Sequence, residues 1–392
     1  MVRIGWGAFS GRHDHSGIPG GIGRLPCNPA ETNPPELDRD LEFPAEPGLV
    51  FADATPGLPV GLRLRADGIL PRFPQMKVAF HSNTLGFRGS EQALWDYANL
   101  NESILGNRSA IFFPARPGME EEPAYKKWRS RFPLYAYGSP HDLKTNLLRE
   151  GAEALYMLKP GPFDGKIVQG IKNCVHAMFL TDEYHGDAFA YVSRWASQVM
   201  TGTEMSYVPH FVPTFSSGEN LRKQLGIPPG ARVFGRHGAA DTFNIPFVQR
   251  AVLDHAQKHP EDRFVFLNTT PFQRNCGLPN IHHLPPTDRP EEKAAFLATC
   301  DAMIHARWHG ETFGLAVGEF AVLGKPVITY GASRERAHLD ALGAKARIYH
   351  DREELLCILE DFQPCQEHGT LYSEYARADF VMEKFKQVFL VN

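Results

Sequence analysis

The sequence predicts an α/β protein with two Rossmann-like units, each built on a parallel sheet. Short apolar runs of strand length alternate with helical segments twice along the chain, first from Lys77 and again after Val208. At 392 residues the chain is also longer than one hydrophobic core usually supports. Ligands of such open sheets bind beyond the carboxyl ends of the strands, so we expect a cleft between the two units.

The first series of elements begins with an apolar run at residues 77–81, which predicts a buried parallel strand. A polar turn follows, and a helix is expected from Ser90 because Leu94, Tyr97 and Ala98 recur at helical spacing. Further strand-like runs in this half lie at residues 109–113, 134–137, 154–158 and 174–179.

The second series follows a polar stretch at residues 214–220. Its expected strands lie at residues 232–235, 263–267, 281–284, 302–306 and 326–330. Its expected helices lie at residues 245–258, 290–298 and 315–323. Residues 371–390 predict one amphipathic helix, with the aromatic residues Tyr375, Phe380, Phe385 and Phe389 available for packing.

Residues 1–75 are rich in Pro and Gly and show no helical or strand periodicity, which predicts a loop-rich N-terminal extension. A glycine run at residues 20–23 has no strand before it and no amphipathic helix after it, so we interpret it as a turn. The predicted division of the remaining chain is a first Rossmann-like domain at 76–212, a second at 213–370 and a C-terminal helix at 371–392.

Composition excludes several classes of partner. The formal net charge of −4 provides no basic surface for nucleic acid. No apolar run is long enough to span a membrane, although peripheral association stays open. Residues 1–7 lack the apolar core of a secretion signal, and the six cysteines are scattered without a C-x-x-C pair. Reduced thiols and a cytoplasmic location are therefore expected.

The strongest functional signal lies at residues 305–320. A strand is expected to end near Ala306, a loop carries Glu311, and Gly314 begins a helix that carries Glu319. A helix start offers free N–H groups and the positive end of a dipole to a phosphate. The glutamates are roughly 12 Å apart along an ideal helix, which suits a sugar and a ribose joined by a diphosphate. The alternative is an ordinary strand–helix turn with two solvated glutamates.

Glu311, seven residues, Glu319 and then residues 324–328 resemble the donor motif of the large family of retaining GT-B glycosyltransferases, which includes bacterial and viral polysaccharide-type enzymes. The resemblance covers about residues 77–390. Its other segments lie in the expected order at residues 86–91, 174–176, 190–193, 220–229 and 233–236. One departure concerns the Lys-Gly that the family has shortly after the arginine matching Arg236. This chain has no lysine there, which leaves Arg307 and Lys325 as candidates for the missing charge.

The resemblance implies a GT-B fold and the transfer of a sugar from a nucleotide diphosphate donor to a hydroxyl of a glycan or glycolipid acceptor, with retention. It places the acceptor on the first domain, the donor on the second, and the C-terminal helix back against the first. The implied catalytic residues are Glu311, His176 and Arg236. The implied donor contacts are Glu319, Phe313, Gly314, Leu315, Ala316, Arg307 and Leu284. The implied first loop contains Gly86, Arg88, Gly89 and Glu91.

Three of these assignments have alternatives. His176 follows apolar residues, as a core histidine would, and Arg236 could be a surface charge after a strand. Gly86 and Gly89 could simply serve a turn that needs positive φ. The resemblance implies that no metal or other cofactor is needed, because in that family the helix start and basic residues neutralise the diphosphate. His305 and His309 are four residues apart but span a strand–loop junction, which is not a zinc pattern.

Two other functions stay open at this stage. A sugar-nucleotide epimerase would act without an acceptor, and a non-catalytic protein of the same fold would only bind glycan or nucleotide. A dehydrogenase is not favoured, because no G-x-G-x-x-G joins a strand to a helix.

Overall fold

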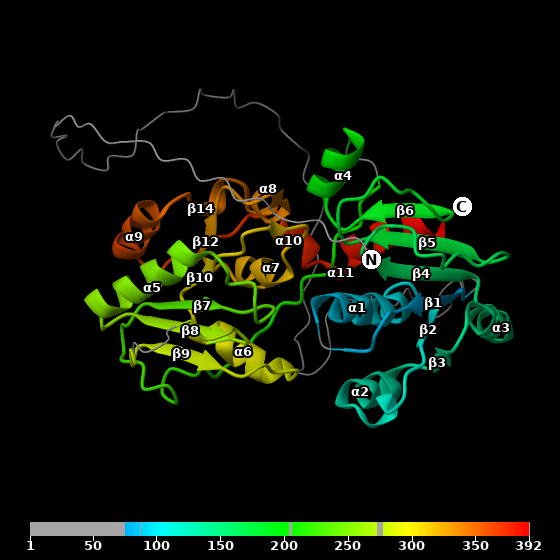
Figure 1. Cartoon of the computed structure of the whole chain (residues 1–392), viewed down its shortest axis with the longest axis horizontal. Coiled ribbons are helices and arrows are strands. Elements are labelled where there is room, and N and C mark those ends of the chain that lie inside the picture. Colours follow the sequence, from blue (N-terminus) through cyan, green and yellow to red (C-terminus); the bar gives the residue numbers. More distant parts are fainter. Residues whose placement is uncertain (1–74, 87, 204–205, 273–276, 392) are drawn as a thin grey trace, which may run out of the picture. The chain divides into compact units, whose positions relative to one another are not determined.

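The computed structural model describes residues 75–86, 88–203, 206–272 and 277–391. Nearly all of the predicted N-terminal extension (1–75) lies outside the described residues. Two six-stranded parallel sheets follow one another along the described chain (Figure 1). The prediction of an α/β protein with two parallel sheets is therefore confirmed.

The first sheet has the spatial order β3-β2-β1-β4-β5-β6, and every pair of neighbours is parallel. Its strands are β1 (Lys77–His81), β2 (Arg108–Pro114), β3 (Leu134–Tyr137), β4 (Ala154–Lys159), β5 (Lys172–Ala177) and β6 (Ala188–Tyr191). Its helices are α1 (Gly89–Ser103), α2 (Pro123–Arg131), α3 (Pro140–Glu150) and α4 (Arg194–Thr201), with a 3-10 turn at Met119–Glu121. The order reverses between β1 and β4, where doubly wound sheets open a crevice.

The second sheet has the order β14-β12-β10-β7-β8-β9 and repeats the topology of the first. Its strands are β7 (Val233–Arg236), β8 (Arg263–Leu267), β9 (Ile281–Leu284), β10 (Ala302–His305), β12 (Val327–Tyr330) and β14 (Ala346–Tyr349). Its helices are α5 (Pro246–Lys258), α6 (Pro290–Thr299), α7 (Leu315–Val322), α8 (Ala337–Leu342) and α9 (Arg352–Asp361), with a 3-10 turn at Gly343–Lys345. A short pair joins β11 (Gly310–Glu311) to β13 (Glu335–Arg336). Here the strand order reverses between β7 and β10.

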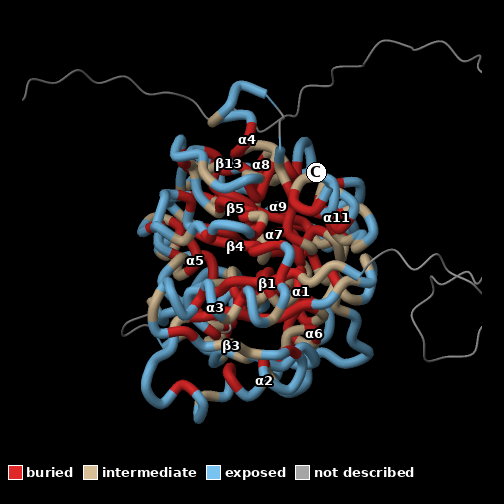
Figure 2. The backbone as a smooth tube through the Cα atoms, turned by 90° about the vertical axis from the view of Figure 1, so that its right-hand side faces the viewer, coloured by how far each residue is buried: buried red, intermediate tan, exposed pale blue. Residues whose placement is uncertain are grey.

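Every strand of the two six-stranded sheets except β6 and β14 matches an apolar run that the sequence predicted. The central strands β1, β4 and β5 are buried along nearly their whole length, as Figure 2 shows. The edge strands β6 and β14 were missed, although the edge strands β3 and β9 are exposed to a similar extent and were predicted.

The prediction of one helix over residues 371–390 is wrong. The segment forms α10 (Tyr372–Tyr375), α11 (Ala378–Phe385) and a π-helical turn, Lys386–Leu390, with extended backbone at Arg377. Its aromatic residues have two destinations. The Tyr372 hydroxyl donates to the Phe313 carbonyl at 2.5 Å, whereas Phe385 stacks on Tyr97 of α1 with ring centroids 5.3 Å apart. A break in the helix allows both sets of contacts.

The end of the chain completes the core of the first sheet. Helix α11 packs on α1, and the π-helical turn packs on β6. The Cys174 thiol of β5 donates to the Phe389 carbonyl at 3.1 Å, and the rings of Phe385 and Phe389 contact Tyr156 of β4. These last residues are therefore part of the first sheet's interior, although they follow the second sheet in sequence.

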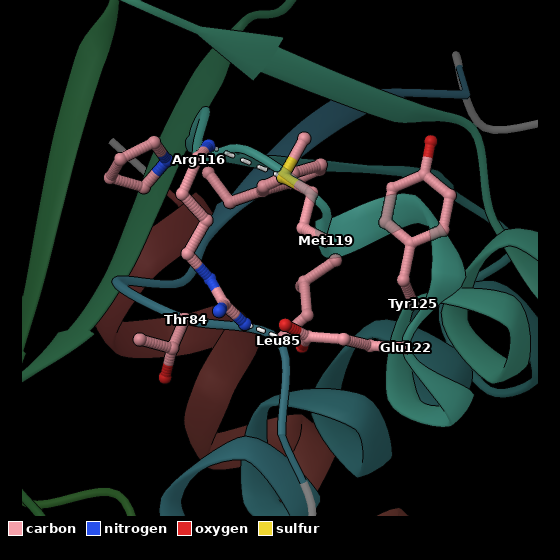
Figure 3. Close-up of a pocket in the computed structure, with 8 residues that line it drawn as sticks. Thr84, Leu85, Arg116, Met119, Glu122 and Tyr125 are labelled. Carbon is pink, nitrogen blue, oxygen red and sulfur yellow. Dashed lines mark hydrogen bonds and ion pairs between the residues drawn. The ribbon is translucent and has the colours of Figure 1, made fainter.

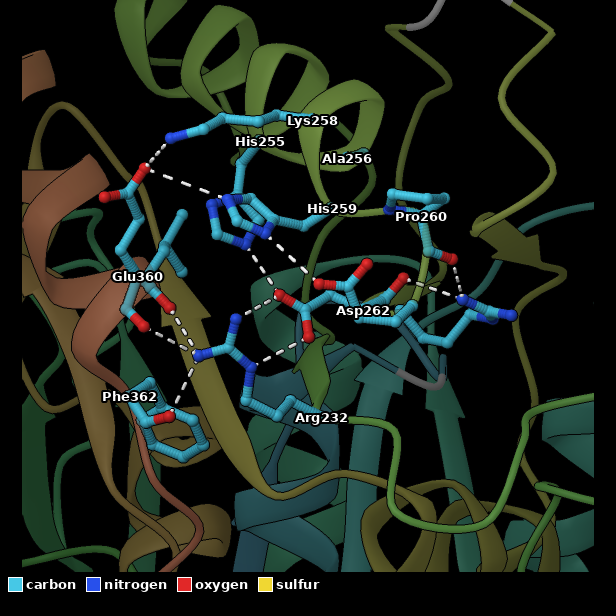
Figure 4. A network of polar contacts seen from close by, with 12 residues as sticks. Arg232, His255, Ala256, Lys258, His259, Pro260, Asp262, Glu360 and Phe362 are labelled. Atoms are coloured by element: carbon cyan, nitrogen blue, oxygen red, sulfur yellow. Dashed lines mark hydrogen bonds and ion pairs between the residues drawn. The ribbon is translucent and has the colours of Figure 1, made fainter.

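A buried ionic network ties together the amino ends of β7 and β8 (Figure 4). Arg232 donates to both Asp262 oxygens at 2.8 and 2.6 Å, and it also donates to three carbonyls at the end of α9. The His255 Nε2 lies 2.7 Å from Asp262 Oδ2. Burial acts to raise the pKa of Asp262, but the hydrogen bonds from His255 and Arg232 lower it below its ordinary value.

Replacing Asp262 by Asn should lower the free energy of unfolding by about 3–5 kcal/mol, because it leaves a buried guanidinium without its carboxylate. Since the folded-state pKa is lowered, the contribution of this carboxylate is present above its unfolded pKa of about 3.9 and is lost as the pH falls further. Urea unfolding of both proteins across pH 3 to 7 measures this. Asp262→Asn should show the weaker pH dependence, and equal stability at pH 7 would contradict the prediction.

Candidate functional site

The predicted residues Arg236, Glu311 and Gly314 lie near the carboxyl ends of β7 and β10, where the order of the second sheet reverses. Arg236 is the last residue of β7, and His305 is the last residue of β10. The chain then runs through a loop and β11, which ends at Glu311, and enters α7 at Leu315. Neighbouring parallel strands thus bring Arg236 and the loop that carries Glu311 to one edge.

Arg236 is a buried cation, only 3% exposed, with neutral partners. Its guanidinium donates to Thr269 Oγ1 at 2.6 Å, to the carbonyls of Ala239 and Asn268 at 2.8 and 3.2 Å, and to the Thr242 hydroxyl. Among the described residues, no carboxylate oxygen lies within 4.0 Å of the Arg236 guanidinium, so Arg236 has no ion-pair partner there. Burial lowers the pKa of Arg236 to about 10, so it stays charged at neutral pH. A fixed guanidinium whose hydrogen-bond partners are all neutral suits an anionic ligand.

Glu311 lies beside two basic side chains. Its carboxylate is 2.6 Å from Arg307 Nη1 and 3.3 Å from His305 Nε2, and its side chain is 21% exposed. Burial acts to raise the pKa of Glu311, but the hydrogen bond from His305 and the charge of Arg307 lower it. His305 is itself held by Thr329, 2.9 Å from Nδ1. Glu311 is thus an ionised carboxylate with a defined orientation and some access to ligand.

Glu319 is enclosed, with its side chain 1% exposed. One oxygen contacts the ammonium of Lys293 on α6, and the other lies 2.8 Å from His237 Nε2. Burial acts to raise the pKa of Glu319, but Lys293 and His237 lower it below its ordinary value. The sequence did not indicate either partner. The expected exposure of this carboxylate to ribose is not found in the ligand-free chain.

A carboxyl group of the first half also approaches Glu319. Asp96, on α1, is close enough to Glu319 and Lys293 for their charges to act on it. Burial raises the pKa of Asp96 to about 7, and its Oδ2 is a buried atom without a partner among the described residues.

Two glycines shape the loop between β10 and α7. Gly310 has φ +77°, and a Cβ there would lie 1.9 Å from the Glu335 carbonyl oxygen. Gly314 has φ +82° and precedes α7 without a side-chain cap. The neighbouring donor candidates differ in burial: Phe313 is packed against His210 and Tyr375, whereas Leu315 and Ala316 are half-buried. Leu284, at the end of β9, is also half-buried.

Lys325 does not supply the missing charge. It precedes β12, and its ammonium binds the carbonyl of Cys300, just before β10. Both positions are at the amino ends of the strands, at the edge opposite Arg236. Arg307 does lie at the correct edge, but it is paired with Glu311. Lys293 is the cation at this edge that sequence reasoning missed.

His176 does not face an open site. It is fully buried, and its Nδ1 lies 2.6 Å from the Tyr156 hydroxyl. The rings of Tyr97, His210 and Phe389 surround it at 5.3–5.7 Å. Burial lowers the pKa of His176 well below its ordinary value. The prediction that it contacts the transferred sugar is not met in this structure, and the alternative of a core histidine describes its position.

The predicted first loop connects β1 to α1. Arg88 and Gly89 are exposed, and a Cβ on Gly89 would meet nothing within 4 Å. Glu91 instead turns inward, where it accepts from Thr84 and Ser90, each at 2.7 Å, and its carboxyl lies 3.6 Å from the Cβ position of Gly86. Glu91 therefore fixes the loop and is not free for a ligand.

A small pocket opens beside this loop at the carboxyl end of β2 (Figure 3). Its lining residues are Thr84, Leu85, Phe113, Pro114, Arg116, Met119, Glu122 and Tyr125. Arg116 and Glu122 form an ion pair of 2.5 Å across it. The first loop thus contributes to a hollow with both apolar and charged walls.

The described residues contain no group of three or more His, Cys, Asp or Glu side chains arranged for a metal ion. Within the same part of the chain, no helix has the length and apolarity to cross a membrane.

No protein-family model matches this sequence, and no curated protein matches it. Solved structures do. HepE from Anabaena, in complex with UDP and glucose, is 16% identical with a TM-score of 0.56, over 80% of this chain and 98% of that one. A glycosyltransferase from Rickettsia africae ESF-5 is 10% identical with a TM-score of 0.54, over 81% and 95%. UDP-GlcNAc 2-epimerase from Neisseria meningitidis, bound to UDP-GlcNAc, is 11% identical with a TM-score of 0.50, over 80% and 100%.

These likenesses concern the fold. The chain has the GT-B fold, with two Rossmann-like sheets, as the sequence resemblance implied.

Proposed function

We propose that this protein is a glycosyltransferase that moves a sugar from a nucleotide diphosphate donor to a hydroxyl of a glycan or glycolipid acceptor, in the assembly of a polysaccharide. The observation that carries the proposal is Arg236, a buried guanidinium without a carboxylate partner at the reversal point of the second sheet. A phosphate group is the ligand chemistry that this position fits best. The similar fold of HepE, whose structure holds UDP and glucose, supports it.

We place the diphosphate of the donor between Arg236 and the start of α7. Glu311 then contacts hydroxyls of the transferred sugar, and Glu319, one turn inside the helix, serves the ribose. Gly314 enters α7 with φ +82°, at a position where a Cβ would lie 3.0 Å from the Tyr372 hydroxyl, so a glycine permits this tight turn into the helix start. The acceptor would bind to the first half of the chain, where the loop with Arg88 and Gly89 lies beside the pocket of Figure 3.

The chemistry we propose is transfer with retention. The bond between the anomeric carbon and the diphosphate oxygen breaks, and the pair of electrons leaves with the diphosphate, which Arg236 stabilises. The acceptor oxygen bonds to the same face of the sugar and gives its proton to the departing phosphate oxygen. Glu311 is held by Arg307 and His305 beside the sugar, where a carboxylate stabilises the positive character of the ring.

An epimerase acting on a sugar nucleotide is the second candidate, because UDP-GlcNAc 2-epimerase has a similar fold. It would need no acceptor. Incubation with a radiolabelled sugar nucleotide separates the two: a transferase passes the label to an acceptor glycan, and an epimerase returns an altered sugar nucleotide.

Thermal unfolding with UDP, GDP, ADP and CDP tests the proposed site, because a ligand that binds only the folded chain raises Tm. At 100 times Kd the stabilisation is about 2.7 kcal/mol. At least one of the four should raise Tm, and the same nucleoside without phosphates should raise it less. If none does, the proposed donor site is wrong.

Turnover should survive EDTA, because Arg236 and the start of α7 are the groups assigned to the diphosphate. The assay compares product formation with and without the chelator, using protein dialysed beforehand. A complete loss that only Mn²⁺ or Mg²⁺ restores would show that a metal neutralises the leaving group.

A further inference from the structure

Lys293 is a cation at the carboxyl edge that the function above does not yet use. It lies in the first turn of α6, which connects β9 to β10. Its ammonium contacts Glu319 Oε1 and lies 4.8 Å over the ring of Phe215. Its side chain is 23% exposed, so it is in contact with both the buried carboxylate and solvent.

Glu319 is 1% exposed, so a ribose hydroxyl can reach its carboxylate only if a group that covers it moves. His237 is the fixed partner: it is buried, stacks on Phe320 and meets the edge of Phe296, with both centroids 5.9 Å away. Lys293 is the movable one, because its ammonium sits on a flexible four-carbon stem and is partly exposed. A ribose would therefore displace the lysine and leave the histidine in place.

We propose that Lys293 is a displaceable latch: it pairs with Glu319 before a donor binds, gives up this carboxylate to the ribose hydroxyls, and passes its ammonium to the diphosphate of the same ligand. This inference rests on the proposed function, since it takes Glu319 as the ribose contact. Lys293 would then be the second cation that residues 237–243 lack.

The neighbourhood of Lys293 supports this movement. His237 Nε2 lies 2.8 Å from Glu319 Oε2, and His237 directly follows Arg236 in the chain. One carboxylate therefore links Lys293 to the strand end that carries the proposed phosphate-binding guanidinium. The competing destination for the released ammonium is Asp96, whose charge interacts with Lys293 and whose Oδ2 has no partner among the described residues.

A latch has a signature that a structural ion pair lacks. Lys293→Met removes the ammonium from the diphosphate and also removes the competitor of the ribose. It should therefore weaken binding of a nucleoside diphosphate by about 10-fold or more, the effect of one charged hydrogen bond. Binding of the nucleoside alone should be unchanged or tighter.

Lys293→Arg is the second variant, and it keeps a cation on Glu319. A guanidinium can hold a carboxylate with two parallel hydrogen bonds, so it should leave less readily than an ammonium. Nucleoside binding should therefore weaken in Lys293→Arg, although the methionine variant does not weaken it. Lys258→Met, which removes a lysine 65% exposed on α5, is the control.

Calorimetry on the full chain provides the test. UDP, GDP, ADP and CDP are titrated first, and the tightest is compared with its own nucleoside on wild type, both Lys293 variants and the control. A loss confined to the diphosphate in Lys293→Met, with weaker nucleoside binding in Lys293→Arg, supports the latch. Equal losses of nucleoside and diphosphate, as expected if the ammonium moves to Asp96 or only supports the fold, overturn it. Unchanged affinities overturn it too. If wild type binds none of the four, the proposed function itself has failed.

Discussion

Replacing Arg236 by methionine should weaken the binding of a nucleoside diphosphate by about 100-fold or more. The guanidinium is buried and already oriented by Thr269, Thr242 and the Ala239 carbonyl, so a phosphate gains a fixed donor without ordering a flexible side chain. Both Nη groups already donate within the protein, which leaves the Nε–H for a phosphate. Loss of one hydrogen bond from a charged group costs about 1.5–3 kcal/mol, and the loss of the buried positive charge adds to it. Calorimetry with UDP, GDP, ADP and CDP measures the change.

The control is Arg263→Met, which replaces the first residue of β8, an arginine at the opposite edge of the same sheet that donates to backbone carbonyls. Because Arg236 also holds residues 239–242 and 268–269 together, the variant is expected to unfold at a lower temperature. Binding is therefore compared well below both transitions. If folded Arg236→Met protein bound the nucleoside diphosphate as tightly as wild type, Arg236 would not bind the diphosphate, and the proposed function would lose its main support.

The two glutamates should separate binding from turnover. Glu311→Ala should lower kcat by roughly 100-fold, while the affinity for the bare nucleoside diphosphate stays nearly unchanged, because that ligand carries no sugar. The side chain of Glu311 is more exposed than that of Glu319, and Arg307 and His305 hold it in one orientation. Transfer assays and calorimetry on the same preparation give both quantities.

Glu319→Ala should show the opposite pattern, with weaker binding of both donor and bare nucleoside diphosphate by roughly 1.5–3 kcal/mol. The substitution also leaves Lys293 and His237 without their carboxylate partner, so the thermal stability of the variant is measured together with its affinity. If Glu311→Ala lost the affinity for the nucleoside diphosphate while Glu319→Ala kept it, the donor would bind in the opposite orientation, with its ribose at Glu311 and its sugar at Glu319. If neither variant changed binding or turnover, the paired-glutamate site would be excluded.

The elements that the sequence predicted are those whose physics is local. Buried parallel strands are continuous apolar runs, and the helix with Leu94, Tyr97 and Ala98 buries the face that its spacing indicated. The prediction was wrong for residues 371–390, where the aromatic periodicity fits one helix. Tyr372 binds the carbonyl of Phe313, before α7, whereas Phe385 packs on Tyr97 of α1, so the segment bends to reach both. The periodicity of apolar residues indicates which side chains are buried, but it does not indicate which part of the protein they pack against.

The positions of the candidate site residues in the fold were predictable where one strand end and one helix start define them. Arg236, Glu311 and Gly314 occupy the edge that their positions implied. Lys325 was a wrong candidate for a reason visible in the sequence, since a residue just before a parallel strand lies at the amino edge. Lys293 and His237 could not be found, because they meet Glu319 only through the packing of α6 and β7 on α7. Neither belongs to a motif.

The placement of Phe385 and Phe389 inside the first sheet has a consequence for synthesis. A chain made from its amino end produces all six strands of that sheet more than 180 residues before these two rings emerge from the ribosome. Until then, Tyr97, Tyr156 and Cys174 lack the surface that covers them. The second sheet has its own strands and helices complete earlier, so the half that is translated last can finish folding first. The amino-terminal half must wait, with aromatic residues exposed, and is the part on which a chaperone would act.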